Sequence, residues 1–215
     1  MPWPPLSNQF VQWVSGAANW LDIVIGTVGF GFGNTQPGRQ AAFLDLLFPF
    51  DTPSAQKQYG AKMSTCALAA LSWLRCWGLD DQELLAPYRP GRAVSDIARI
   101  AIRHRAWRGP DTMPELGDIV LVGGHSQWGG TEHVFAVVEI AGDVVRSVDG
   151  GQSDNQGQAI VLRERPIVRR YGQLWLGSRR VMGVARINEL VPAREQVRPV
   201  RASDGNARCH EDPAP

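Results

Sequence analysis

Cysteine and histidine are the residue types of this 215-residue sequence that could carry out nucleophilic chemistry. The three cysteines, Cys66, Cys76 and Cys209, have no short pair spacing, which excludes a CxxC redox motif and argues against a disulfide framework. The four histidines are scattered, and the closest pair, His125 and His133, has no flanking cysteine or second acidic residue at ligand spacing. The sequence therefore predicts no metal site and no cofactor, and leaves a thiol nucleophile with a histidine base as the chemistry to consider.

Cys66 lies where a helix is predicted to begin. Ser64 and Thr65 are helix-capping residues, the segment 66–77 is rich in alanine and leucine, and Gly78 is typical of a helix end. The first turn of a helix stabilises a thiolate through its N–H groups and dipole, so Cys66 is the candidate nucleophile. The alternative is a small buried hydrophobic residue, which is the usual role of a free cysteine.

His133 opens an apolar segment, 133–140, directly after the Gly-rich segment 123–132. A histidine at the start of a strand can face a cleft, where it would serve as the general base for Cys66. The alternative is a histidine that only covers the edge of the sheet.

Asp149 is the predicted partner of His133. Segments 133–140 and 144–149 can form a hairpin that turns at Ala141 and Gly142, and a ladder centred on Ala141 places His133 opposite Asp149. A shift of one full residue leaves the two side chains diagonal on one face, whereas a half-residue shift sends them to opposite faces. The prediction therefore requires an odd number of loop residues.

The three residues have separate predicted roles. Asp149 would fix the tautomer and orientation of His133, which would take the proton of Cys66 and give a thiolate–imidazolium pair. Asp149 could equally be the first residue of an Asp-Gly-Gly turn, and Gln152 is the alternative third residue of the site. Trp128, in the loop before His133, is a candidate to stack on substrate, and Gln152 is a second candidate to bind it.

The predicted elements are a group of helices followed by strands. Helices are expected at 66–77 and 93–105, and strands at 118–122, 133–140, 144–149, 159–165 and 180–187. This order predicts an α+β fold for residues 61–190. Residues 1–60 are expected to be an aromatic and Gly-rich extension, and residues 191–215 a disordered tail. We assign six arginines of the last third to a solvated face: Arg163, Arg165, Arg169, Arg170, Arg179 and Arg180.

Bulk properties limit the partners. The net charge of +1 gives no reason to expect nucleic acid as a partner. The apolar stretch 13–32 contains Asn19, Asp22 and several glycines, so we expect no stable insertion into a membrane. No basic residue precedes Arg39, and the start therefore does not have the pattern of a signal peptide. We expect synthesis in a bacterial cytoplasm, with export by another route if the substrate lies in the periplasm or cell wall.

The order of motifs resembles the NlpC/P60 and CHAP groups of papain-like cysteine hydrolases over about residues 60 to 190. Ser-Thr-Cys66 opens a helix, Gly117-Asp118 precedes the first main strand, His133 begins the next, and Asp149 ends the third. The resemblance implies a papain-like fold, with N-terminal helices packed on an antiparallel five-strand sheet. It also implies cleavage of amide bonds in peptidoglycan stem peptides, without a cofactor.

The sequence departs from that pattern at the nucleophile, because Thr65-Cys66-Ala67 replaces the usual Asp-Cys-Ser-Gly. A phage enzyme or a secreted antibacterial toxin with an immunity protein as partner is consistent with the resemblance. Two other functions stay open. One is a transglutaminase-like acyltransferase or deamidase that acts on proteins, and the other is a binding module without catalysis.

Overall fold

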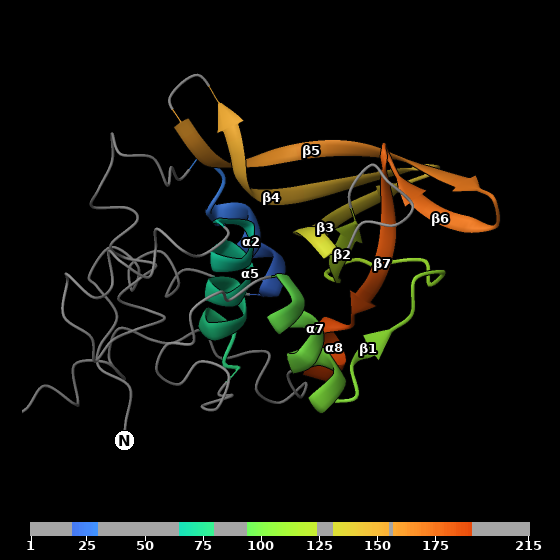
Figure 1. The fold of residues 1–215 in the computed structure, drawn as a ribbon. Helices are drawn as coiled ribbons and strands as arrows, with labels where there is room; N and C mark the ends of the chain where they lie inside the picture. Colours follow the sequence, from blue (N-terminus) through green and yellow to red (C-terminus); the bar gives the residue numbers. More distant parts are fainter. Residues whose placement is uncertain (1–18, 30–64, 80–93, 124–130, 155–156, 191–215) are drawn as a thin grey trace, which may run out of the picture.

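The computed structural model describes residues 19–29, 65–79, 94–123, 131–154 and 157–190 (Figure 1). The predicted tail at 191–215 and the loop residue Trp128 lie outside these ranges, as does most of the predicted extension at 1–60. Within them, no helix is long and apolar enough to cross a membrane.

In the part of the chain that the structure describes, seven strands form one antiparallel sheet. They are β1 (Trp107–Arg108), β2 (Ile119–Gly123), β3 (Thr131–Ala141), β4 (Val144–Asp154), β5 (Gly157–Arg170), β6 (Gln173–Leu176) and β7 (Arg179–Ala185). Their order is β1-β7-β2-β3-β4-β5-β6, and each predicted strand corresponds to one of them.

The sheet closes on itself. Strand β6 pairs with β7 as well as with β5, so six strands, from β7 through β2, β3, β4 and β5 to β6, form an antiparallel barrel. The short β1 pairs only with β7, outside this ring. The predicted papain-like α+β fold, with helices on a five-strand sheet, is therefore wrong.

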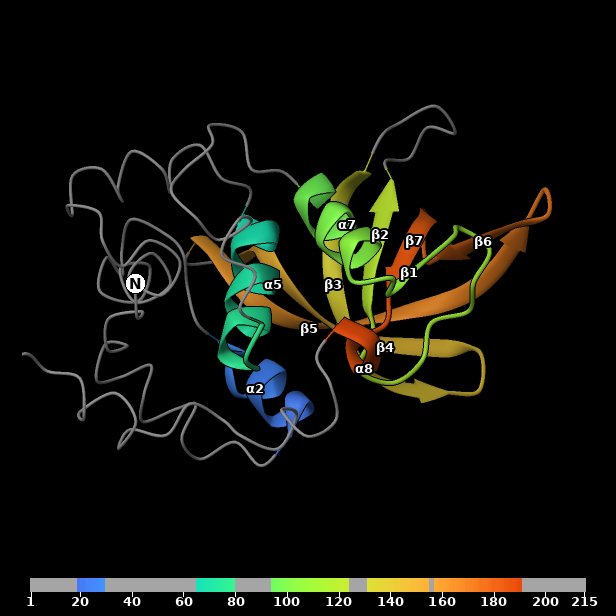
Figure 2. The same cartoon turned by 90° about the horizontal axis from the view of Figure 1, so that it is seen from below.

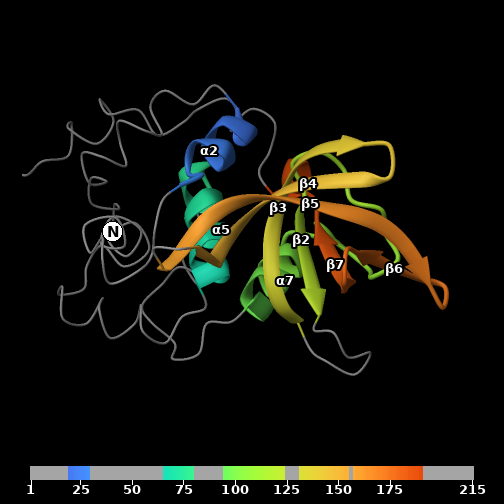
Figure 3. The ribbon, with the colours of Figure 1, turned by 90° about the horizontal axis from the view of Figure 1, so that it is seen from above.

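Strand β5 makes the closure possible because it is long enough to serve two neighbours. Its residues 157–166 pair with β4, and residues 167–170 pair with β6. Figure 3 shows β5 crossing the molecule from the side of α5 to the side of β6. The tight β5–β6 connection has two residues with positive φ, Tyr171 at 52° and Gly172 at 76°. This turn sends the chain back along β5 towards β7.

Side-chain alternation produces two cores. One buried cluster is the inside of the barrel: Val120, Val122, Phe135, Val137, Val145, Leu174, Leu176, Val181 and Val184. The intervening residues face outward onto the helices and join a second cluster there, as Leu121, Val134 and Ala136 do.

Among the described residues, four helices cover that outer face along one side of the barrel (Figure 2). They are α2 (Trp20–Gly26), α5 (Thr65–Cys76), α7 (Val94–Arg103) and α8 (Ile187–Leu190). Helix α5 packs on β3 and β4, and α7 packs on β3 and β7. The predicted helix at 66–77 is confirmed, with Cys66 in its first turn.

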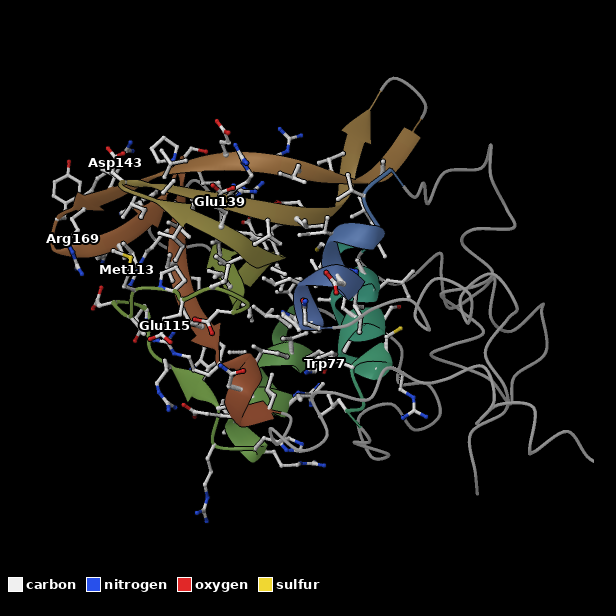
Figure 4. All side chains as sticks on the ribbon, turned by 180° about the vertical axis from the view of Figure 1, so that it is seen from behind. Trp77, Met113, Glu115, Glu139, Asp143 and Arg169 are labelled. Atoms are coloured by element: carbon white, nitrogen blue, oxygen red, sulfur yellow. The ribbon has the colours of Figure 1, made fainter. Side chains whose placement is uncertain are left out.

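Indole hydrogen bonds tie α2 to the segment before β2 and to α5. Trp20 Nε1 donates to the Gly117 carbonyl at 2.8 Å, and Trp73 Nε1 of α5 donates to Thr27 Oγ1 at 3.0 Å. Trp20 also meets Trp77 edge-to-face, with ring centroids 6.2 Å apart. Figure 4 places Trp77 beside α2 and α5, and Asp143 and Arg169 at the opposite end of the molecule.

Asp118, beside Gly117, has a structural role. Its carboxylate accepts hydrogen bonds from the Glu115 N–H at 2.7 Å and from Arg186 Nη1 at 2.5 Å. Burial raises the pKa of Asp118 to about 6, because desolvation outweighs both donors.

We expect Asp118 to make the free energy of unfolding depend on pH. A folded pKa of about 6 against an ordinary 3.8 favours the folded state most at low pH, and this advantage is lost as pH rises through about 6. Urea unfolding of wild type and Asp118→Asn at a series of pH values isolates this group. Between pH 3.8 and about 6 the stability of wild type relative to the variant should fall by up to about 3 kcal/mol. A difference that does not change with pH would contradict the assignment.

Gly183 of β7 is predicted to tolerate no side chain. A Cβ there would lie 2.0 Å from Cζ2 of Trp107, whose ring covers the strand. Gly183→Ala should lower the free energy of unfolding by about 1–3 kcal/mol through overpacking. The matched control is Gly109→Ala, where a Cβ meets nothing within 4 Å, so the expected change is below about 0.5 kcal/mol. Equal urea midpoints for the two variants would contradict the packing of Trp107.

Candidate active site

The structure brings Cys66, His133 and Asp149 together from three elements. Cys66 is the second residue of α5, His133 lies near the start of β3, and Asp149 lies in the middle of β4. All three are buried, with exposed fractions of 6%, 6% and 0%. Because α5 packs on β3 and β4, its N-terminal turn meets the pair of strands at this point.

His133 contacts both Cys66 and Asp149. Its Nε2 lies 2.7 Å from Asp149 Oδ2, and the ring also hydrogen-bonds with the Cys66 side chain. Since Nε2 is engaged by the carboxylate, Nδ1 is the nitrogen left for the thiol. This is the Cys–His–Asp order that the sequence predicted.

The strand register behind this contact differs from the predicted one. Asp149 pairs directly with Phe135, so His133 is diagonal to Asp149 on the same face instead of opposite it. The turn has two residues, Gly142 and Asp143, which is the even number expected to separate the side chains. A β-bulge at Val138 adds one residue to β3 and returns His133 to the face of Asp149.

Two further irregularities border the site. In β2 the pairing shifts between Val122, which lies opposite His133, and Gly123. In β4 it shifts after Asp149, where Gly151 has a φ of 70°. The Asp-Gly-Gly sequence is therefore a bulge inside a continuing strand and not a turn, and it bends β4 next to the carboxylate.

Asp149 is held by more than His133. Ser147 Oγ donates to Asp149 Oδ1 at 2.5 Å, and Arg165 Nη2 forms an ion pair with Asp149 Oδ2. Arg165 Nε also donates to Ser147 Oγ at 3.1 Å. A carboxylate with no exposed surface thus has a histidine, a hydroxyl and a guanidinium around it, which compensates for its burial.

These contacts shift both ionisable partners towards their charged forms. Burial alone would lower the pKa of His133, but hydrogen bonds with Asp149 and Cys66 and attraction to both raise it above its ordinary 6.5. Burial alone would raise the pKa of Asp149, but His133 and Arg165 lower it below its ordinary 3.8. The pair therefore favours an imidazolium beside a carboxylate, which stabilises a thiolate at Cys66.

Cys76 is a poor alternative nucleophile. It is fully buried at the other end of α5, and burial raises the pKa of its thiol well above the ordinary value.

Arg165 and Ser147 are functional candidates that sequence reasoning missed. The arginine was assigned to a solvated face, yet its side chain is only 11% exposed. The alternation along β5 carried a usable signal, since Glu164 and Pro166 are exposed whereas Ile167 packs against the barrel interior. Arg165 is in phase with Ile167, and an inward arginine needs a buried anion. Arg163 is in the same phase yet exposed, so this signal does not separate the two arginines.

The two predicted substrate-binding residues have different outcomes. Trp128 lies outside the described residues. Gln152 is in β4, where it pairs with Ala159 just beyond the bulge, and its side chain is not among those described. In the described part of the chain, no group of three or more His, Cys, Asp or Glu residues could hold a metal ion.

No protein-family model, curated protein or solved structure matches this chain. The resemblance to the NlpC/P60 and CHAP groups therefore has no support from these comparisons, and the argument for catalysis depends on the site itself.

Proposed function

We propose that this protein is a cysteine hydrolase of amide bonds, with Cys66 as nucleophile, His133 as general base and acid, and Asp149 as the residue that orients His133. The observation that supports it most is the buried chain of hydrogen bonds from Cys66 through His133 to Asp149, with 2.7 Å between His133 Nε2 and the carboxylate. A histidine that only stabilised the barrel would have no need of a thiol partner at a helix start.

The first half of the reaction forms an acyl-enzyme. His133 takes the thiol proton, and the Cys66 thiolate attacks the carbonyl carbon to give a tetrahedral intermediate. The imidazolium then gives its proton to the leaving nitrogen, so the C–N bond breaks and an amine departs. The positive end of α5 favours the thiolate in the resting enzyme.

The second half uses water. His133 removes a proton from a water molecule that attacks the thioester, and the carboxylic acid leaves as the Cys66–acyl bond breaks. Throughout, Asp149 keeps one tautomer and stabilises the imidazolium, while Ser147 and Arg165 hold the carboxylate in place.

Peptidoglycan stem peptides are the proposed substrate class, and the order of motifs around Cys66, His133 and Asp149 is what supports it. Incubation with purified bacterial sacculi should release soluble fragments, with one new amine and one new carboxyl group for each bond cleaved. Pretreatment with iodoacetamide should prevent the release. An added primary amine separates hydrolysis from acyl transfer, since a transglutaminase-like enzyme would incorporate it into the product.

These experiments distinguish a wrong substrate from a wrong mechanism. If activated acyl esters acylate Cys66 but sacculi stay intact, the peptidoglycan assignment is wrong and the thiol mechanism stands. If neither acyl esters nor iodoacetamide modifies Cys66 faster than Cys76 in the folded protein, the catalytic proposal fails and a binding module is favoured.

A further inference from the structure

Arg165 occupies an unusual place for an arginine on a barrel strand. Its guanidinium contacts both Asp149 and Ser147, and its Cζ lies 4.4 Å from the centroid of the Phe135 ring. Phe135 is the residue directly paired with Asp149 and lies in the barrel interior. The planar group is thus fixed by two hydrogen bonds and an aromatic face, which limits its movement.

The acceptor atom links Arg165 to the proposed reaction. Arg165 Nη2 and His133 Nε2 both reach Asp149 Oδ2, while Ser147 holds Oδ1. A carboxylate bound at both oxygens cannot rotate away from the imidazole without breaking one of these bonds. Arg165 would therefore act on the histidine through the carboxylate.

We propose that Arg165 is a positioning residue, which fixes the Asp149 carboxylate against His133 and limits how strongly that carboxylate attracts the proton of the imidazole. The inference rests on the proposed function of the site. A lone buried carboxylate would bind the proton of His133 more tightly, and a neighbouring guanidinium weakens this attraction. The proton then stays transferable to a leaving group.

The charged groups that the structure places around His133 come from five elements. Cys66 of α5 and Asp149 of β4 contact the ring, and Arg165 of β5 contacts Asp149. Glu132, next to His133 on β3, is exposed and lies 3.8 Å from Arg179 of β7. On β2 the residue opposite His133 is the apolar Val122. Of the two arginines, Arg165 is the one that the structure shows in contact with Asp149.

The test compares Arg165→Met with Arg163→Met in the full-length protein. Arg163 lies two residues earlier on β5 and is exposed, so the same substitution there controls for a general loss of charge. Two readouts need no substrate: the pKa of His133, measured by NMR titration of its ring proton, and the rate at which iodoacetamide alkylates Cys66. With a substrate available, kcat and KM form the third readout.

Arg165→Met should raise the pKa of His133 by about one unit, because the imidazolium loses a like-charged neighbour and keeps Asp149. Alkylation of Cys66 and kcat should fall about tenfold to a hundredfold with KM unchanged. The Asp149 carboxylate, no longer fixed by Arg165, can then turn and carry the hydrogen-bonded imidazole away from the Cys66 thiol. Arg165→Lys keeps the charge with a single donor group. It should leave the pKa of His133 near wild type and restore kcat only in part.

Arg163→Met should leave every readout unchanged. A His133 pKa that is the same in wild type and Arg165→Met would overturn the inference, as would a shifted pKa with unaltered alkylation and kcat. If Arg165→Met does not fold, Arg165→Lys with wild-type alkylation and kcat overturns it. Failure of the proposed function looks different, because Cys66 of wild type would then be alkylated no faster than Cys66 of His133→Ala.

Discussion

Replacing Cys66 with serine is expected to reduce amide hydrolysis at least about a thousandfold, and replacing it with alanine to abolish acyl-enzyme formation. A hydroxyl is far less acidic than a thiol, so the imidazolium–carboxylate pair at His133 and Asp149 cannot hold its anion. The barrel itself should be little affected, because Cys66 is at the start of α5 and the substitutions are small. Initial rates on sacculi or on an acyl-amide substrate measure the effect.

The matched control is Cys76→Ala, on the same helix. Cys76 is fully buried and ten residues from the site, so the variant should keep the rate per folded molecule despite some loss of stability. Hydrolysis that survives in Cys66→Ala, or that disappears equally in Cys76→Ala, would be incompatible with Cys66 as nucleophile.

Asp149→Asn is expected to lower kcat by about a hundredfold to ten-thousandfold and to change the pH profile. Asp149 is one of the groups that raise the pKa of His133, so the neutral amide should let that pKa fall. The imidazolium must protonate the leaving nitrogen, and the alkaline limb of the kcat profile should therefore move to lower pH. Profiles of kcat against pH for the two proteins give this shift directly.

Loss of the carboxylate should also alter stability. Arg165 would keep its buried position without its anion, which costs about 3–5 kcal/mol for a broken buried pair. The folded pKa of Asp149 is lowered below the ordinary 3.8, so its contribution is present above that value and is lost as pH falls through the folded pKa. In Asp149→Asn, acid unfolding should lack the loss of stability that protonation of Asp149 causes in wild type.

Asp143→Asn provides the control for both measurements. Asp143 is exposed in the β3–β4 turn of the same hairpin, so its variant should match wild type in kcat and in acid unfolding. An alkaline limb that stays in place in Asp149→Asn would mean that the carboxylate does not act on His133.

The strands were predictable where the alternation of side chains was strong, and the closure of the barrel was not. Apolar runs gave both ends of β2, β3 and β7 within two residues, and the start of β4. The predicted end of β4 at Asp149 is five residues too early. Strand β6 has only four residues between Gly172 and Gly177, too few to show a period. The bending of β5 from β4 to β6 depends on pairings between distant segments, and no local pattern reports them.

The three site residues could be identified from their types and positions. The reason given for Asp149, the register of the hairpin, was incomplete. A helix start identified Cys66 and a strand start identified His133, both from local signals. Asp149 depended on a hairpin register, and the two-residue turn alone would have placed it on the wrong face. The bulge at Val138 corrects this, and an apolar residue within an apolar run gives no sign of it.

Closure by β7 has a consequence for how the protein acquires its shape during synthesis. Strand β7 pairs with β1, β2 and β6, and Ala185 is the partner of Ile119, 66 positions earlier. A growing chain cannot form these contacts until β7 has left the ribosome, so folding of the barrel is expected to be slow and to wait for β7. The nucleophile at position 66 would thus emerge long before the histidine and the carboxylate that activate it, and the nascent chain would stay inactive until the barrel closes.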